Sequence, residues 1–106
     1  MVTPVYVLVR LWIREGLEAE FEAYERKVCR IMARYGGVIE RTIRPARTVS
    51  QESGPPFEIH VLRFQSQALY EAYRADSERA ALSEERVATI THSEALVGIA
   101  GPTYGP

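Results

Sequence analysis

Hydrophobic positions in two parts of the chain alternate with a period of two, which is typical of β-strands. Residues 5–13 (VYVLVRLWI) are apolar at every odd position, and most of the even positions are apolar or aromatic as well. Residues 57–64 (FEIHVLRF) show the same feature, because apolar side chains occur at both odd and even positions. Side chains of a strand alternate between the two faces of its sheet. We therefore expect both strands to be central and to be covered on each face.

Between these strands, apolar residues recur at spacings of three and four, which is typical of a helix lying on a sheet. Five glutamates occur around the first half of this segment and four basic residues in its second half, an order that complements the helix dipole. Gly36 and Gly37 end the helix, since glycine readily adopts the positive φ of a helix C-cap. The stripe consists of Leu17, Phe21, Tyr24, Val28, Ile31 and Tyr35.

A second helix follows residues 57–64 and is predicted to begin at Ser66, a favourable N-cap residue. Its apolar face contains Leu69 and Tyr73 at helical spacing. Asp76 and Ser77 then interrupt the pattern, and we expect Ser77 to cap a further helical piece that runs from Glu78 to about Ile90.

The remaining segments complete an α+β domain. Residues 38–44 mix apolar and charged side chains, as edge strands do, and residues 94–100 (EALVGIA) are predicted to form the last strand. Residues 45–56 contain three prolines and no periodicity, and loops of this length are either functional or mobile. Residues 101–106 form a tail whose glycines and prolines do not continue a strand.

The order strand, helix, strand, strand, helix, strand predicts one ferredoxin-like βαββαβ domain over residues 1–106. Right-handed crossovers give an antiparallel sheet of spatial order 4-1-3-2, with both helices on one face. The other face then has no cover within the chain. We expect Leu8 and Trp12 on the first strand and Leu62 on the third to lie there, and we expect a homodimer that joins two such sheet faces.

Composition is consistent with a single folded domain, since 46% of the 106 residues are hydrophobic and 25% are charged. The net charge of −1, without a basic cluster, argues against binding to nucleic acid or to an anionic membrane. Arg10 interrupts the N-terminal apolar run and no basic region precedes it, so neither a signal peptide nor a membrane span is expected. The single cysteine, Cys29, fits a reducing compartment, and we expect a cytoplasmic location.

Two long runs of the sequence resemble the dimeric α+β barrel superfamily over roughly residues 5 to 99. They are VYVLVRLWIREGLEAEFEAYERKVCRIMARYGG and IHVLRFQSQALYEAYRADSERAALSEERVATITHSEALVG. The most specific features are the double glycine after the first helix, the Phe64 to Ser66 turn and the ending from Arg86 to Gly98. Within the superfamily, the chain is most similar to small families of unknown function beside the antibiotic biosynthesis monooxygenases and the NIPSNAP-like proteins.

This resemblance implies the fold and the dimer more firmly than it implies a reaction. The superfamily includes cofactor-free monooxygenases, haem-binding and haem-degrading enzymes, isomerases and ligand-sensing modules. The Asn, Trp and His constellation of the haem-degrading relatives has no matching positions here, since Trp12 is the only tryptophan and lies on the first strand.

Four residues are the candidates for catalysis. His60 lies among apolar neighbours and would be a pocket acid/base; alternatively, it is a histidine of the core or of the dimer interface. Arg86, which matches an arginine that recurs in the resembling families, would bind a carboxylate or another anionic oxygen, or would simply pair with nearby glutamates. Tyr70 and Tyr73 would donate hydroxyl hydrogen bonds to an apolar ligand, or would be ordinary core residues.

No cofactor or metal ion is expected from the sequence. The two histidines, His60 and His92, are predicted to be two strand spacings apart, about 9.5 Å, and no HxH, HExxH or CxxC motif accompanies them. Cys29 has no resolving partner and is interpreted as structural. Glycine-rich phosphate loops and GxSxG elbows are also absent from the sequence.

Two hypotheses of function follow. The first is a cofactor-independent enzyme, monooxygenase-like or isomerase-like, that acts on a small apolar or aromatic oxygenated compound. The second is a noncatalytic module that binds a small molecule or only dimerises. A ligand retained by the purified protein would test for a pocket directly.

Overall fold

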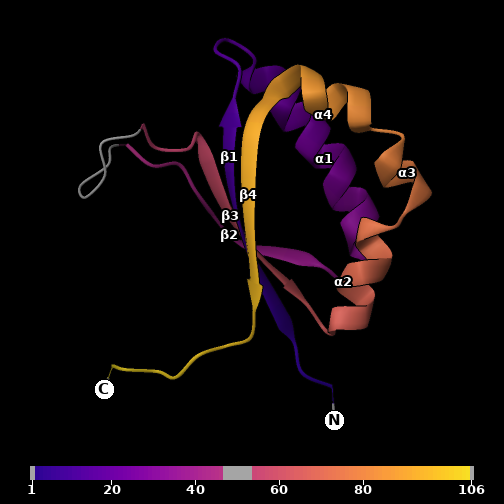
Figure 1. Cartoon of the computed structure of the whole chain (residues 1–106), viewed down its shortest axis with the longest axis vertical. Helices are drawn as coiled ribbons and strands as arrows, with labels where there is room; N and C mark the ends of the chain where they lie inside the picture. Colours follow the sequence, from indigo (N-terminus) through magenta and orange to yellow (C-terminus); the bar gives the residue numbers. More distant parts are fainter. Residues whose placement is uncertain (1, 47–53, 106) are drawn as a thin grey trace.

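Four strands form one antiparallel sheet in the computed structural model, which describes residues 2–46 and 54–105. The strands are β1 (Val5–Ile13), β2 (Val38–Ile43), β3 (Glu58–Phe64) and β4 (Ile90–Gly98). Their spatial order is β2-β3-β1-β4 (Figure 1). The predicted order and ferredoxin-like fold are therefore confirmed, and the two strands that are apolar on both faces, β1 and β3, are the central pair.

The helices all lie on one face of this sheet (Figure 1). They are α1 (Glu18–Arg34), α2 (Gln67–Arg74), α3 (Ser77–Ala80) and α4 (Ser83–Thr89). The apolar stripes of α1 and α2 pack on the inner side chains of the sheet, because burying both apolar surfaces together removes them from water. The resulting core consists of Val5, Val7, Leu11, Phe21, Tyr24, Val28, Ile31, Met32, Leu62, Phe64, Tyr70, Tyr73 and Ile90.

The double glycine after α1 has two different physical roles. Gly36 has a positive φ of 71°, which glycine adopts without a steric cost. Gly37 is instead required by packing, since a Cβ atom at this position would overlap the ring of Phe64 and the side chain of Met32. Together they let the chain turn directly from α1 into β2.

The helix caps confirm one prediction and correct another. Ser66 caps α2 as expected, because its Oγ accepts a hydrogen bond from the Leu69 backbone N–H at 3.1 Å. The cap of α3 is Asp76 rather than Ser77: the Asp76 carboxylate accepts from the Arg79 N–H at 2.9 Å, and Ser77 already lies in the helix. Asp and Ser are comparably good N-caps, so residue type alone did not separate them.

The helical piece expected from Glu78 to about Ile90 is divided into α3 and α4, and α4 ends at Thr89. The break lets Leu82 turn inward and pack against the core. The last strand then begins at Ile90, four residues earlier than the predicted Glu94, and ends at Gly98.

A register shift explains why the start of β4 was missed. Trp12 pairs with His92, whereas the next residue, Ile13, pairs with Ile90, so that Thr91 is an extra residue. Ile90 is consequently buried in the core while His92 contacts Trp12 on the opposite face, with ring centroids 5.0 Å apart. The bulge breaks the period of two by which a strand is recognised. The edge strand β2 contains a similar shift, with Glu40 between the paired residues Ile39 and Arg41.

The sheet face away from the helices has no cover in the described part of the chain, and we call it the open face. Leu62 is not on it, contrary to prediction: it is 6% exposed and packs under the helices. The reason is parity, since Leu62 shares the side of β3 that contains the fully buried Phe64. The open face instead contains Leu8, Arg10, Trp12, Ile59, Val61 and Leu96, as the register of the central strands requires.

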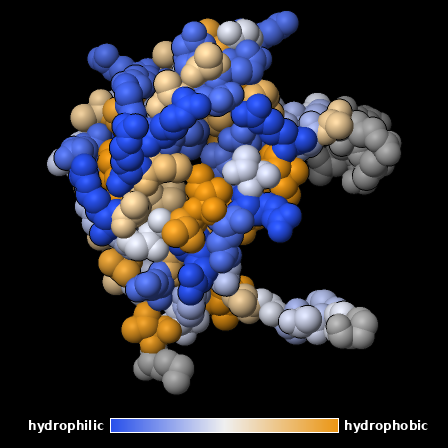
Figure 2. Space-filling model, turned by 180° about the vertical axis from the view of Figure 1, so that it is seen from behind, coloured by the Kyte–Doolittle hydropathy of each residue, from blue (hydrophilic) through white to orange (hydrophobic). Residues whose placement is uncertain are grey.

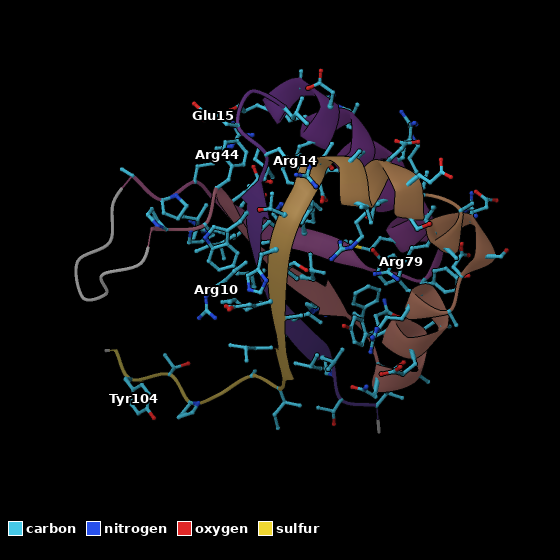
Figure 3. The ribbon with its side chains drawn as sticks, turned by 45° about the horizontal axis from the view of Figure 1, so that its top comes forward. Arg10, Arg14, Glu15, Arg44, Arg79 and Tyr104 are labelled. Atoms are coloured by element: carbon cyan, nitrogen blue, oxygen red, sulfur yellow. The ribbon has the colours of Figure 1, made fainter. Side chains whose placement is uncertain are left out.

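The C-terminal residues 99–105 project from the end of β4 on the side of the open face, away from the helices (Figures 1 and 2). Arg10 also lies on this side and pairs with Glu94 at 3.4 Å, whereas Arg79 lies on the side of the helices (Figure 3). The two sides of the sheet therefore present different surfaces, one filled by helices and one open.

Candidate functional site

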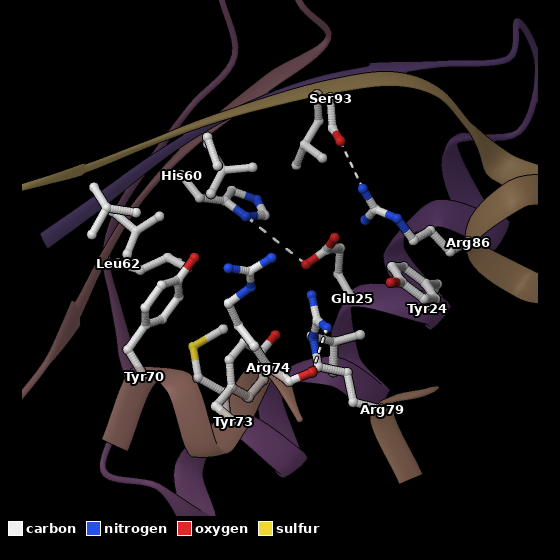
Figure 4. A pocket seen from close by; sticks show the side chains of 17 residues that line it. Tyr24, Glu25, His60, Leu62, Tyr70, Tyr73, Arg74, Arg79, Arg86 and Ser93 are labelled. Carbon is white, nitrogen blue, oxygen red and sulfur yellow. Dashed lines mark hydrogen bonds and ion pairs between the residues drawn. The ribbon is translucent and has the colours of Figure 1, made fainter. Parts of the chain in front are cut away.

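A pocket of about 350 Å³ lies between the sheet and the helices. The four residues that the sequence singled out, His60, Tyr70, Tyr73 and Arg86, all line it (Figure 4). They come from β3, α2 and α4, so the fold gathers side chains that are distant in the sequence. The other lining residues are Val7, Val9, Leu11, Tyr24, Glu25, Val28, Met32, Leu62, Arg74, Arg79, Ser93, Ala95 and Val97.

The floor of the pocket is apolar because it consists of inner side chains of the sheet. Val7, Val9 and Leu11 are alternate residues of β1, and Leu62 is their neighbour on β3. On the far side, Val28 extends the apolar surface from α1. This surface suits the hydrocarbon body of a small ligand.

His60 is 4% exposed and faces the helices and the pocket, so the alternative placement in the open face is wrong. Its Nε2 lies 2.5 Å from Oε2 of Glu58, and its Nδ1 lies 3.9 Å from Oε2 of Glu25. Glu58 is equally buried and accepts a second hydrogen bond, from Nε of Arg44 at 2.8 Å. The imidazole is thus fixed at one nitrogen and directs the other toward Glu25 and the pocket (Figure 4).

Glu25 is a site residue that sequence reasoning missed. In the sequence it is one of the five glutamates that complement the helix dipole, yet it lies four residues after Phe21 and three before Val28, on the apolar stripe of α1. A carboxyl group at such a position was the available signal. Burial raises the pKa of Glu25 above its ordinary value, and the nearby His60 and Arg86 only partly oppose this effect.

Arg86 donates a hydrogen bond from Nη2 to the Ser93 hydroxyl at 2.6 Å (Figure 4). Among the described residues it forms no ion pair with a glutamate, which was the alternative interpretation of this residue. Ser93 comes from β4 and faces the pocket because the bulge at Thr91 turns it inward. Arg86 is therefore anchored at the pocket wall by a neutral partner.

Tyr70 and Tyr73 are both core and pocket residues, since each is nearly buried and each packs against Phe64, with ring centroids 5.2 and 5.3 Å away. Burial raises the pKa of the Tyr73 phenol, and the Arg79 guanidinium beside it partly offsets this shift. Burial thus keeps the Tyr73 phenol protonated at neutral pH, so its hydroxyl group can donate a hydrogen bond to a ligand.

Arg74 and Arg79 also line the pocket and were not predicted. Each projects over an aromatic ring, with the Arg79 Cζ 4.8 Å from the Tyr73 ring centroid and the Arg74 Cζ 5.9 Å from that of Tyr70. Arginines on a polar helix face are usually solvated, so the sequence held no signal for these two.

No cluster of three or more metal-binding side chains occurs in the part of the chain that the structure describes. The two histidines lie on opposite faces of the sheet, which separates them further than the expected two strand spacings. Burial raises the pKa of the Cys29 thiol, as do the nearby carboxylates of Glu25 and Glu58.

Within residues 2–46 and 54–105, no helix has both the length and the hydrophobicity that a membrane crossing requires.

Comparison with known proteins identifies relatives by structure only. No protein-family model matches the chain, and no curated protein matches it in sequence. Among solved structures, a protein of unknown function from Rhodopseudomonas palustris superposes with a TM-score of 0.83 at 13% identity, covering 97% of this chain and 86% of that one. SnoaB, a cofactor-independent oxygenase from Streptomyces nogalater, superposes with a TM-score of 0.70 at 18% identity, covering 96% and 97%.

A DABB family protein from Mesorhizobium loti, described as having a ferredoxin-like fold, is also similar, with a TM-score of 0.65 at 15% identity over 93% of this chain and 98% of that one. These neighbours are of the kinds that the sequence resembles. At such identities they establish the shared fold, and they do not establish a shared reaction.

Proposed function

We propose that the protein binds a small apolar or aromatic oxygenated compound in this pocket and catalyses a proton transfer on it without a cofactor. The observation that carries the proposal is the placement of His60, a buried imidazole with one nitrogen held by a carboxylate and the other directed toward the pocket. A buried acid/base group beside an apolar cavity is the arrangement that such chemistry needs.

The hydrogen bonding of His60 defines its role. When Nε2 carries the hydrogen and donates it to Glu58, Nδ1 has a free lone pair and can accept a proton from the ligand. Glu58 is then a positioning residue, and the carboxyl group of Glu25, 3.9 Å from Nδ1, stabilises the imidazolium that forms.

The remaining candidates act on the oxygen of the ligand. Removing a proton from the carbon beside a carbonyl group, or from the hydroxyl group of a phenol, places negative charge on that oxygen, which Arg86 and the hydroxyl groups of Tyr70 and Tyr73 would stabilise. The carbanion or enolate so formed is reprotonated at another atom in an isomerase-like reaction. In a monooxygenase-like reaction it reacts with molecular oxygen as the second substrate.

The test is deuterium exchange. Small ketones with a fused aromatic ring, such as 2-indanone, are incubated with the protein in D₂O, and NMR follows deuterium incorporation at the carbons next to the carbonyl. We expect His60→Ala to slow the protein-dependent exchange by about 10²- to 10⁴-fold, the usual contribution of a general base. His92→Ala, which changes the exposed histidine of the open face, is the matched control and should leave the rate unchanged.

An oxygen electrode with the same compounds reports whether molecular oxygen is consumed. Equal exchange rates in the wild type and in folded His60→Ala would contradict the catalytic role. Binding of the ketones without any exchange would favour the noncatalytic binding module.

A further inference from the structure

We infer that the ligand of this pocket carries a carboxylate group, which Arg74, Arg79 and Arg86 bind together. The inference concerns the same pocket and rests on the proposed function for the presence of a ligand there, but it is independent of the proton transfer. The inference is based on three guanidinium groups, from α2, α3 and α4, that converge on one apolar cavity (Figure 4).

None of the three forms an ion pair with a carboxylate in the described part of the chain, whereas other arginines do. Arg10, Arg26, Arg34 and Arg44 each have a glutamate within 4.0 Å. Arg14, Arg30, Arg41 and Arg63 also have no carboxylate partner among the described residues, but none of them lines this pocket. Positive charge in a partly desolvated site requires a counter-charge, and a ligand would bring it.

The carboxyl groups near the pocket do not supply this counter-charge. Glu58 is already engaged by both Arg44 and His60. Glu25 is the one carboxyl group among the described residues that line the pocket, and its burial opposes ionisation by raising its pKa. Three guanidinium groups therefore face at most one negative charge.

The arginines are held ready for a ligand. Arg79 donates a hydrogen bond from Nη1 to the Arg74 carbonyl at 3.3 Å and lies over the Tyr73 ring, so its position is fixed by neutral groups. Its Nε is buried and has no hydrogen-bond partner among the residues that the structure describes, which is a cost that a bound oxygen atom would remove. Arg86 is anchored in the same way by the Ser93 hydroxyl.

A carboxylate fits better than a phosphate. The planar fork of arginine binds both groups, but Glu25 lies in the same pocket, and any negative charge on it would repel a dianion more than a monoanion. The cavity of about 350 Å³ is at the small end of ligand sites, and its apolar floor requires an apolar body. An aromatic or branched aliphatic monocarboxylate meets these conditions.

The experiment compares benzoate with benzamide, its neutral isostere, and with phenyl phosphate, using NMR chemical-shift titrations of the full chain. We expect benzoate to bind at least about 10-fold more tightly than benzamide, as charge-assisted hydrogen bonds should provide. Arg79→Gln should weaken benzoate binding by about 10- to 100-fold and leave benzamide binding unchanged. Arg30→Gln, an exposed position on α1 outside the pocket, removes the same charge and should alter neither.

Arg74→Gln provides a second variant, at an exposed position, in case Arg79→Gln does not fold. Equal affinities for benzoate and benzamide, or tighter binding of phenyl phosphate than of benzoate, would overturn the inference. His60→Ala separates the two proposals: benzoate binding that depends on Arg79, with no proton exchange in any variant, contradicts only the catalytic proposal. Exchange that depends on His60, without discrimination between benzoate and benzamide, contradicts only the carboxylate inference.

Discussion

Glu25 occupies a position on α1 where an apolar side chain would be expected, and its ionisation opposes folding. Burial raises the pKa of Glu25 in the folded state above the ordinary value of 4.5, so the folded protein binds a proton more tightly than the unfolded chain does. The resulting stabilisation is fully present below the unfolded pKa and is lost as the pH rises through the folded pKa. A buried carboxyl group whose ionisation costs stability is typical of a residue kept for function.

Replacing Glu25 with Gln should therefore stabilise the protein at pH 8, because Gln has a similar shape and cannot ionise. The gain over the wild type should shrink as the pH falls toward 4, where the wild-type carboxyl group is protonated. Urea unfolding at several pH values measures this difference. Glu40→Gln, at an exposed position on β2, controls for the loss of one negative charge. A destabilised Glu25→Gln variant at pH 8 would show that Glu25 acts mainly as an ion-pair partner.

The residues of the pocket differ in how far the sequence could reveal them. His60 stood out because a lone imidazole in an apolar strand is unusual, and its neighbours Tyr70 and Tyr73 followed from helical spacing. Arg74 and Arg79 did not stand out, since their importance arises only from the folding of α2 and α3 over the pocket. Glu58 was hidden for a related reason, because strand alternation does not reveal that Arg44 will neutralise it.

Among the secondary structure elements, the three short helices that cover the pocket depend on specific polar contacts. α3 and α4 are tied to α1 by the exposed ion pairs Arg34–Glu78 and Lys27–Glu85, and exposed pairs of this kind add at most about 1 kcal/mol each. Asp76 has a larger role, because it caps α3 and also accepts a hydrogen bond from the Tyr35 hydroxyl at 2.5 Å.

Asp76→Ala should accordingly lower the free energy of unfolding by about 1 to 2 kcal/mol, the usual cost of a lost N-cap. Ser77→Ala is the matched control, since Ser77 lies one residue later and does not cap the helix; it should change stability by less than about 0.5 kcal/mol. Denaturant unfolding of the two variants measures both effects. A larger loss from Ser77→Ala than from Asp76→Ala would contradict the assignment of the cap.

The order and type of the main elements followed from the sequence because period two and period 3.6 are local signals. The division of the last helical stretch and the start of β4 did not follow. Leu82 packs against the core at the break between α3 and α4, and the bulge at Thr91 lets Ile90 and His92 face opposite ways. Both outcomes depend on packing between distant segments.

At the scale of the whole molecule, we propose that the open face joins two copies of the chain. Its apolar residues are partly exposed, and Leu96 on β4 is 57% exposed. An uncovered sheet face of this kind is a typical protein interface, and two identical faces can associate about a two-fold axis. The correction of Leu62 to the core leaves this argument intact, because Ile59 and Val61 replace it on the open face.

Analytical ultracentrifugation at micromolar concentration should then show two subunits. Leu96→Glu should yield a folded monomer, because it would bury a charge without a partner in the interface. Val87→Glu, a comparable change at a position on α4 that is 66% exposed, should leave the dimer intact. A monomeric wild type, or dissociation by Val87→Glu alone, would contradict the proposed interface.

The two register shifts lie at Glu40 and Thr91, and each places its extra residue in an edge strand. Chain length in this sheet can therefore vary at its margins, where an added residue disturbs pairing with one neighbour only. An insertion within β1 would instead exchange its two sides. It would move Arg10 and Trp12 beneath the helices, and it would move the residues of the pocket floor to the open face. Over evolutionary time, the central strands are thus expected to change by substitution, while insertions and deletions accumulate in β2 and β4.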